Sequence, residues 1–477
     1  RARRRPGGIM RILFIQRLPF AHIGAMLLSA ELKRAGHETD VLIAGDGLTE
    51  AGADAVRRAD LLGFHWISGS DGWLRDFLRR LPERPPIVVG GPHPTFVPED
   101  ISAVSADFAI RGEADEALPE LASSLDAPCD FLKNINNLCF DDGGALHISP
   151  QRPLVEDLDS LPFQDVSLYA RFHRLATIIS ELYPGMCSRG CPNSCSYCFN
   201  KKFRDMHKGL GAYTRRRSPA NVVEELVRAK KDLSIKRVVF EDDSFITSKR
   251  WLEEFAELYA REVALPFVCQ TPATTLDAET AGMLARMGCV SARVGVETAD
   301  EGNRRKILRK NVSDQQITEA VARLKERGIM AQTYNMVGIP GEGFDDALKT
   351  MLFNRRMKTD FTWVSFYRHY PGTELREEFE TTTEAAEAAP AASVPDSFFT
   401  PSAVTAADIR MSNLGMLMQF FNVVRAPVTV VRLLCALPLS PLYALIHKAV
   451  YALSLKKINR LGWLPFIRIS LGLKRFF

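Results

Sequence analysis

The sequence predicts an α/β protein in which two series of alternating strands and helices are followed by a helical carboxyl-terminal region. Three observations predict this class. Short apolar runs alternate with amphipathic segments from Ile12 onward, which is the pattern of parallel sheets covered by helices. Of the 477 residues, 46% are hydrophobic and 25% charged, which is ordinary for a globular chain and excludes wholesale disorder and fibrous classes. No acidic residue follows Asp408, so the end of the chain has a composition of its own.

The first alternating series occupies residues 10–130. Residues 1–9 read as an extension before Met10, and a helix is predicted over 24–35 because its leucines and methionine share one face and Gly36 can end it. Such a series predicts a doubly wound parallel sheet, which binds ligands at the carboxyl ends of its strands. The strands are predicted over 12–16, 39–45, 60–64, 86–91 and 108–111.

Four further segments follow. Residues 131–180 read as a connecting segment with a hairpin signal, DDGG, at 141–144, and a second α/β series covers 181–380. The Ala/Glu/Pro-biased stretch over 381–400 reads as a linker, and 401–477 as a basic, amphipathic helical domain. No run of 18 uncharged apolar residues precedes residue 408, so no membrane span is expected in the main body.

The strongest chemical signal is a loop of three cysteines with the spacing C-x3-C-x2-C, formed by Cys191, Cys195 and Cys198. Three thiolates on a tight loop can bind three irons of a [4Fe–4S] cube and leave the fourth iron open. An open iron is what a chelating cosubstrate requires, whereas an electron-transfer cluster would use a fourth thiolate. Gly190 and Pro192 help the backbone to turn around the cube.

A zinc knuckle and buried structural cysteines are the alternatives. Zinc commonly takes four ligands in paired C-x2-C units, and this loop contains only one such unit. The nearest fourth candidate is Cys187, four residues upstream of the loop, and we expect it to be a bystander rather than a ligand.

With Tyr197 before its last cysteine, this loop resembles that of the radical S-adenosylmethionine (SAM) superfamily. The resemblance implies that SAM chelates the open iron and is cleaved by one electron to a 5′-deoxyadenosyl radical. By the same resemblance, Asp242 and Asp243 follow a strand at the position that receives the SAM amino group, Glu297 contacts the ribose or the amino acid, and Gly338 lies in the turn beside the adenine. Each could instead be an ordinary helix cap, solvated strand end or structural turn. The matching segments are 240–245, 294–298, 335–342 and 370–375.

Residues 10–125 resemble the cobalamin-binding domain that precedes the barrel in one large radical SAM class. Gly90 and Gly91, and the turn Gly112-Glu113, carry this resemblance and are predicted to line the cobalamin site, since glycine lets the backbone approach a large planar ligand. Many such domains have D-x-H-x-x-G after the first strand, with the histidine below the cobalt. Aligned on Gly24, that histidine position holds alanine and His22 is one place away, so we do not expect it to bind cobalt. A vestigial domain or another nucleotide ligand are the alternatives.

The two residues that directly follow the third predicted strand, His65 and Trp66, are expected to line the lower face of this pocket. The alternative is a packed aromatic pair at a strand end.

The last 69 residues hold ten basic and no acidic side chains, so they carry +10, and the first 408 residues carry −6 of the total of +4. Basic residues interleaved with leucine, valine and tryptophan suit an anionic bilayer surface. The alternative is a helical cap that packs on the barrel and solvates its cations. Nucleic acid is not expected, because the cations are not gathered on a polar face.

Together these features predict a Rossmann-like cobalamin-binding domain, a partial (β/α)6 radical SAM barrel and a helical carboxyl-terminal domain. The resemblance implies an enzyme with a [4Fe–4S] cluster, SAM and cobalamin that methylates an unactivated carbon of a small or lipid-like substrate. Radical cyclisation or rearrangement with the same cofactors, and a non-catalytic iron–sulfur sensor or assembly protein, are the alternatives. The expected partners are a flavodoxin- or ferredoxin-type electron donor and, through the tail, the inner face of the membrane, in a cytoplasmic protein.

Overall fold

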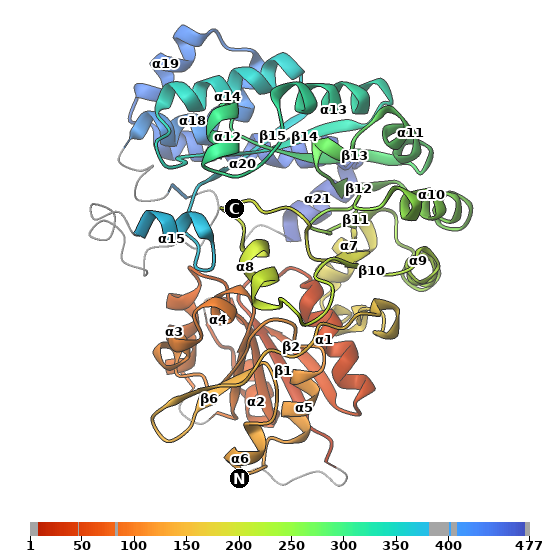
Figure 1. Cartoon of the computed structure of the whole chain (residues 1–477), viewed down its shortest axis with the longest axis vertical. Coiled ribbons are helices and arrows are strands. Elements are labelled where there is room, and N and C mark those ends of the chain that lie inside the picture. Colours follow the sequence, from red (N-terminus) through yellow and green to blue (C-terminus); the bar gives the residue numbers. More distant parts are fainter. Residues whose placement is uncertain (1–7, 46, 82–83, 381–399, 402–407, 473–477) are drawn as a thin grey trace.

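The computed structural model describes residues 8–45, 47–81, 84–380, 400–401 and 408–472, which form two sheets and a group of carboxyl-terminal helices (Figure 1). The predicted linker over 381–400 lies outside the described residues except for residue 400, as do the first seven residues of the predicted extension.

Seven strands form the first sheet, in the order β2-β1-β3-β4-β5-β6-β7. The first five pair in parallel, which confirms the predicted doubly wound sheet. The hairpin signal at 141–144 joins β6 to β7, and β6 pairs antiparallel with β5, so the sheet continues into the predicted connecting segment. The strands are β1 (Arg11–Gln16), β2 (Glu38–Ile43), β3 (Leu61–His65), β4 (Ile87–Gly90), β5 (Phe108–Ile110), β6 (Leu138–Asp141) and β7 (Leu146–Ile148).

Helices cover both faces of this sheet because its strands are apolar on both sides. In β1, Ile12 and Phe14 join a core that includes Met26 of α1, while Leu13 and Ile15 join a second core on the other face. The helices of this half are α1 (Ile23–Arg34), α2 (Glu50–Arg58), α3 (Asp71–Arg79), α4 (Pro92–Phe96), α5 (Ala117–Ser123) and α6 (Cys129–Leu132).

The second sheet has six parallel strands in the order β15-β14-β13-β12-β11-β8, as expected for a partial barrel. Successive residues along its strands alternate between two environments. In β13, Ala292 and Val294 pack in the hydrophobic core, whereas Arg293, between them, faces away from it and pairs with Glu241 after β11. The strands are β8 (Tyr183–Gly185), β11 (Val238–Phe240), β12 (Phe267–Gln270), β13 (Cys289–Glu297), β14 (Met330–Val337) and β15 (Phe361–Phe366).

Local sequence sets the ends of the barrel helices. Ser218 caps α9, whose first residue is Pro219, and Ser313 with Gln316 forms a capping box at the start of α13. The helices are α7 (His173–Glu181), α8 (Phe199–Met206), α9 (Pro219–Leu233), α10 (Lys249–Leu258), α11 (Ala278–Arg286), α12 (Glu301–Lys306), α13 (Asp314–Glu326), α14 (Phe344–Met357) and α15 (Glu374–Glu380).

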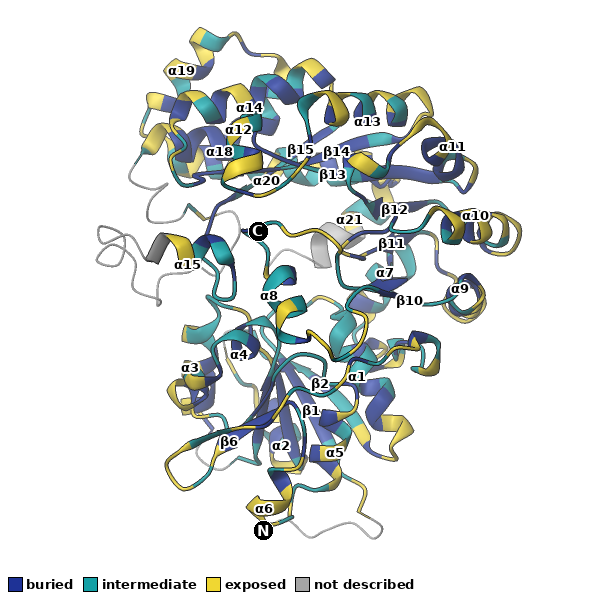
Figure 2. Cartoon of the chain, in the orientation of Figure 1, coloured by how far each residue is buried: buried dark blue, intermediate teal, exposed yellow. Residues whose placement is uncertain are grey.

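The carboxyl-terminal helices are α18 (Ile409–Val424), α19 (Val428–Ala436), α20 (Ser440–Ile458) and α21 (Trp463–Gly472). Their inner faces pack on the barrel, as the cap alternative expects: Leu414 and Met418 of α18 share a core with Val364 and Phe366 of β15. Figure 2 shows both sheets buried, with exposed residues on the outer faces of the helices. Among the described helices, none combines the length and the apolar character needed to cross a bilayer.

Candidate active site

The cysteine loop lies between the short strand β9 (Ser188–Arg189) and helix α8. It begins at Gly190, whose φ is +83° and where a Cβ would come within 2.4 Å of the Tyr213 carbonyl oxygen, so only glycine fits there. β9 pairs antiparallel with β10 (Arg215–Arg216), and this small ribbon anchors the loop from behind.

The three predicted cluster ligands of this loop are half-buried. Asn193 Nδ2 lies 3.5 Å from Cys191 Sγ, and Asn200 Nδ2 lies 3.4 Å from Cys198 Sγ, so both amides can donate to sulfur. Three partly accessible thiols with amide donors beside them are a donor set that fits an iron–sulfur cluster, in which each thiolate takes a different iron. Among the described residues, no three His, Cys, Asp or Glu side chains converge on a site for a single metal ion.

Burial raises the thiol pKa of Cys191 and of Cys195, and it raises the pKa of Cys198 to about 12. Thiols bind iron as thiolates, so cluster assembly must release protons from this loop. The nearby ammonium of Lys310 opposes the effect of burial, because its positive charge lowers the pKa of Cys195.

Glu297 and Lys310 form an ion pair beside the loop. Glu297 ends β13 at a shift of register, has a φ of +66°, and accepts a hydrogen bond from Lys310 Nζ at 2.7 Å. Lys310 Nζ also lies 3.4 Å from the hydroxyl of Tyr197, the aromatic residue within the cysteine motif. Burial disfavours the ammonium, but the charge of Glu297 raises the pKa of Lys310 above its ordinary value, so Lys310 is a cation at neutral pH. The sequence motifs did not single out Lys310.

The two adjacent aspartates after β11 have different surroundings. The fully buried carboxylate of Asp242 accepts hydrogen bonds from the Cys187 backbone N–H, at 3.0 Å, and from the Ser188 hydroxyl. Burial raises its pKa to about 6, and its hydrogen bonds hold the strand that leads into the cysteine loop. Asp243 instead lines the cavity described below, near Asn200, and its pKa is also raised by burial. Cys187 is fully buried, and its backbone N–H is held by Asp242.

Gly338 follows β14 with a φ of +84°. Its N–H donates to Glu342 Oε2 at 2.7 Å, which closes the turn over 338–342. The turn therefore lies at the same carboxyl edge of the sheet as Glu297, and Gly338 is not among the residues that line the large cavity.

A cavity of about 450 Å³ lies between the carboxyl edge of the first sheet and the cysteine loop. It brings together all four residues predicted to contact cobalamin, namely Gly90, Gly91, Gly112 and Glu113. Gly91, with a φ of +111°, has no room for a side chain, since a Cβ would lie 2.7 Å from the His65 ring. At Gly90 a Cβ would meet no protein atom within 4 Å and would project into open space. This shelf without side chains fits a large planar ligand.

His22 and His65 also line this cavity and form a pair, with His22 Nε2 3.1 Å from His65 Nδ1. His22 Nδ1 accepts from the Ala25 N–H at 3.4 Å and so caps α1. Burial lowers the pKa of His22 to about 4 and that of His65 to about 3, so both rings are neutral near pH 7. Trp66 does not line the cavity: it is buried against His93 on the opposite side of the strand end, so the prediction for Trp66 is wrong.

Ion pairs join the two halves of the site. Arg189, two residues before Cys191, makes two hydrogen bonds to Asp115, at 2.7 and 2.8 Å, and Glu113 pairs with Arg215 at 2.5 Å. The carboxylates come from the loop after β5 and the arginines from the β9–β10 ribbon, so the first sheet is fastened to the strand that carries the cysteine loop. Arg189 and Asp115 were not predicted, although both flank motifs that were.

Two family models match the chain. Residues 17–122 match the B12 binding domain and residues 186–353 match the Radical SAM superfamily. The first domain implies cobalamin, and the second implies a [4Fe–4S] cluster and SAM. These are the cofactors that the glycine shelf and the three-thiol loop fit.

Curated relatives and solved structures agree with this domain pair. An uncharacterized methyltransferase of Pyrococcus horikoshii is 27% identical over 294 residues, which is 61% of this chain and 62% of that protein. An anaerobic magnesium-protoporphyrin IX monomethyl ester cyclase of Rubrivivax gelatinosus is 24% identical over 77% of this chain and 70% of that protein. The radical SAM methyltransferase TsrM of Kitasatospora setae, solved with tryptophan and a SAM analogue, has a similar fold, with a TM-score of 0.62, 18% identity and coverage of 78% of this chain and 76% of that one.

The chain thus spans less than two thirds of the length of the first of these relatives. It combines, in this order, a B12 binding domain over residues 17–122 and a Radical SAM domain over residues 186–353.

Proposed function

We propose that this protein is a methyltransferase that uses SAM and cobalamin to methylate an unactivated carbon of a small or lipid-like substrate. The observation that carries the proposal is that Gly90 and Gly91 of the first sheet and Asp243 of the barrel line one cavity of about 450 Å³. When bound, the cluster supplies an electron to SAM and cobalamin supplies a carrier for the methyl group. Two cofactor sites that open on one cavity fit a reaction in which activation and methylation take place at the same carbon.

Within this proposal, Cys191, Cys195 and Cys198 hold the cluster. Asp243, Glu297 and Gly338 are the proposed SAM contacts, and the ion pair with Lys310 orients the Glu297 carboxylate. Asp242 stays a predicted contact, and its hydrogen bonds to residues 187 and 188 support a positioning role for the cysteine loop. Gly90, Gly91, Gly112 and Glu113 are the proposed cobalamin contacts.

The proposed substrate site lies on the inner face of the barrel, next to this cavity. Glu241, which lines the cavity, accepts a hydrogen bond from Arg293 at 3.0 Å. Beyond this pair, the rings of Tyr334 and Trp363 meet edge to face with centroids 5.0 Å apart. A charged pair beside an aromatic wall can orient a polar end of the substrate while the rings exclude water from an apolar part.

Radical cyclisation with the same cofactors is the second candidate. It is favoured by one observation, the similarity to the Rubrivivax cyclase over 77% of this chain.

The test uses full-length protein reconstituted without oxygen with iron, sulfide and hydroxocobalamin. It is incubated with SAM carrying a deuterated methyl group, a reductant, and a metabolite extract from a strain that lacks the gene. Methylation predicts S-adenosylhomocysteine, 5′-deoxyadenosine and a deuterated product by mass spectrometry. Deoxyadenosine with an unlabelled product would support cyclisation instead. Absence of both nucleosides, in a preparation whose absorbance shows that both cofactors are loaded, would contradict the proposal.

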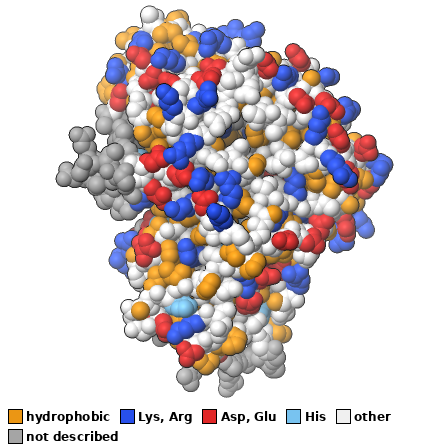
Figure 3. Space-filling model, in the orientation of Figure 1, with side chains coloured by type: hydrophobic (Ala, Val, Ile, Leu, Met, Phe, Trp, Pro, Cys, Tyr) orange, Lys and Arg blue, Asp and Glu red, His pale blue; other side chains and the backbone are white. Residues whose placement is uncertain are grey.

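We also propose two partners. A flavodoxin- or ferredoxin-type protein would supply the electron and would meet α8, directly after the cysteine loop, where Lys201 and Lys202 pair with Glu374 and Glu377. Figure 3 shows basic side chains, interspersed with acidic ones, near the middle of the molecule on the face it presents. The second partner is the inner face of the membrane, which a cytoplasmic protein would meet through its carboxyl-terminal helices.

A further inference from the structure

The carboxyl-terminal helices hold most of the exposed apolar side chains. Of the twenty large hydrophobic residues that are exposed in the described part of the chain, twelve lie between residues 409 and 467. Isolated exposed hydrophobic residues are normal on a soluble surface, but a concentration of them on a few helices marks a site of interaction.

Eight of these residues lie between the end of α18 and the second half of α20, and we call this set the apolar face. On α20, Leu442, Leu445 and Leu453 are 49%, 64% and 52% exposed, and their spacing puts them on one side of the helix. On α19, Leu433 is 64% exposed, although Val431 and Cys435 of the same helix are fully buried. The apolar face comprises Val423, Val424, Val430, Leu433, Leu439, Leu442, Leu445 and Leu453.

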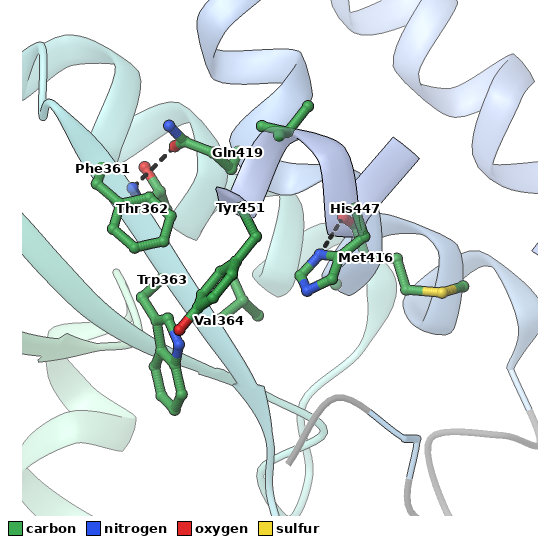
Figure 4. A pocket seen from close by; sticks show the side chains of 10 residues that line it. Phe361, Thr362, Trp363, Val364, Met416, Gln419, His447 and Tyr451 are labelled. Carbon is green, nitrogen blue, oxygen red and sulfur yellow. Dashed lines mark hydrogen bonds between the residues drawn. The ribbon is translucent and has the colours of Figure 1, made fainter. Parts of the chain in front are cut away.

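The opposite sides of these helices are occupied. Tyr443 of α20 is buried in the core that α18 shares with β15. His447 Nδ1 of α20 lies 2.9 Å from the Met416 carbonyl oxygen, and Tyr451 reaches Trp363 of β15 (Figure 4). α19 and α20 are therefore held by their inner sides, and the apolar face cannot turn inward without breaking this packing.

The carboxyl-terminal segments that carry the apolar face have only basic side chains, although one of these, Arg432, pairs with Asp345 of α14 at 2.6 Å. Arg425, Arg432 and Lys448 are exposed on the same segments, and no acidic residue follows Asp408. A surface adapted to water mixes acidic with basic residues. Leucines interleaved with arginine and lysine instead match a bilayer surface, where the aliphatic chains enter the acyl region and the cations meet lipid phosphates.

We propose that the apolar face, with its neighbouring cations, docks this protein on membranes that contain anionic lipids. The inference deepens the membrane contact proposed above and does not depend on methyl transfer. α19 lies at the end of the molecule opposite the B12 binding domain, so docking leaves that domain in solvent (Figure 1). Tyr451 lies on the inner side of α20 and hydrogen-bonds to Trp363, whose ring faces the proposed substrate site. The helix that meets the lipid thus also contacts, through Tyr451, a residue of the proposed substrate site.

The experiment is flotation of the full-length protein with vesicles of phosphatidylcholine alone or of phosphatidylcholine with phosphatidylglycerol, at low and high salt. Binding is expected only with phosphatidylglycerol and should weaken as salt screens the charges. The double substitution Leu442→Glu with Leu445→Glu should lower partitioning into vesicles by at least ~10-fold, since it removes two aliphatic chains that would enter the bilayer and adds negative charge. The matched control is Val227→Glu with Leu233→Glu, on exposed residues of α9, which should bind like the wild type.

Three outcomes would overturn the proposal. They are no binding to phosphatidylglycerol vesicles, equal binding to both kinds of vesicle, and full binding by the α20 double variant. If sedimentation shows self-association that this variant abolishes while vesicles do not bind, the apolar face is an interface between copies of the chain. Cluster and cobalamin absorbance, measured on the same variants after reconstitution, shows whether the catalytic half is intact, so failure of docking is distinguishable from failure of the proposed function.

Discussion

The large cavity has two walls that were built in opposite ways. On the first sheet, Gly90, Gly91 and Gly112 form a wall by leaving side chains out. On the barrel, the facing wall is formed by the side chains of Glu241 and Asp243, next to the cysteine loop. Both walls are carboxyl edges of parallel sheets, where ligands bind in this class of fold. The difference teaches that one edge provides shape for a large ligand and the other provides charge and sulfur for chemistry.

If this contrast is right, removal of one thiol from the cysteine loop should abolish cluster binding at the barrel wall. Cys195→Ala should abolish the absorbance of the reconstituted protein at roughly 400 nm, because the cluster needs all three thiolates. SAM cleavage should be lost with it. Anaerobic absorbance spectra and iron content provide the measurement. Cys187→Ala is the control and should retain the cluster. Equal loss in both variants would mean that the loop has been assigned the wrong ligands.

On the wall formed by the glycines of the first sheet, an added side chain should interfere with binding of the ligand. Gly90→Val should weaken cobalamin binding by ~10- to 100-fold, since a Cβ at this position meets no protein atom within 4 Å and the new side chain would occupy the ligand's space. Titration of the apoprotein with hydroxocobalamin, followed by absorbance, measures the effect. Gly47→Val, at another glycine with open space around it, should bind like the wild type. Unchanged binding by Gly90→Val would place cobalamin elsewhere.

The contrast requires the two walls to be held together. Arg189→Gln leaves the carboxylate of Asp115, which is 6% exposed, without its two hydrogen bonds, so it should lower the free energy of unfolding by about 3 kcal/mol. Urea denaturation checks this value. Arg57→Gln breaks the exposed pair with Asp54 and should cost less than about 1 kcal/mol. Similar losses in the two variants would show that Arg189 does not fasten the walls.

The last prediction concerns the histidine pair on the first wall, whose effect appears only as the pH is lowered. The folded pKa of His22, about 4, lies below the ordinary value of 6.5. Between these values the unfolded chain therefore binds more protons than the folded one. The stability from this group is complete above pH 6.5 and is lost as the pH falls toward 4, by up to about 1.4 kcal/mol per pH unit.

His22→Asn keeps a capping side chain for α1 but removes this titration. Its melting temperature should therefore fall less steeply than that of the wild-type apoprotein between pH 6.5 and 4. Thermal denaturation across this range is the measurement, and parallel curves would contradict the shifted pKa.

Much of the fold and part of the site could be predicted from the sequence because the signals are local. The five parallel strands of the first sheet lie within two residues of their predicted bounds, since apolar runs and glycine ends are read within a few neighbouring residues. The same holds for the cysteine spacing and for the glycines of the shelf. The hairpin β6–β7 was foreseen as a turn but not as part of the sheet, because pairing depends on a partner strand.

The sequence by itself determined the donor atoms and the backbone freedom of this site: three thiols on one loop and glycines where a side chain would collide. Only the tertiary structure decided the partners of its charges. Arg189 and Asp115 are 74 residues apart and Glu297 and Lys310 are 13 apart, so no local pattern joins them. The tertiary structure also decided that Asp242 supports the cysteine loop while Asp243 faces the cavity, and which side of α20 is exposed. Coulomb energy and burial depend on distance in space, and the chain order of the residues does not encode that distance.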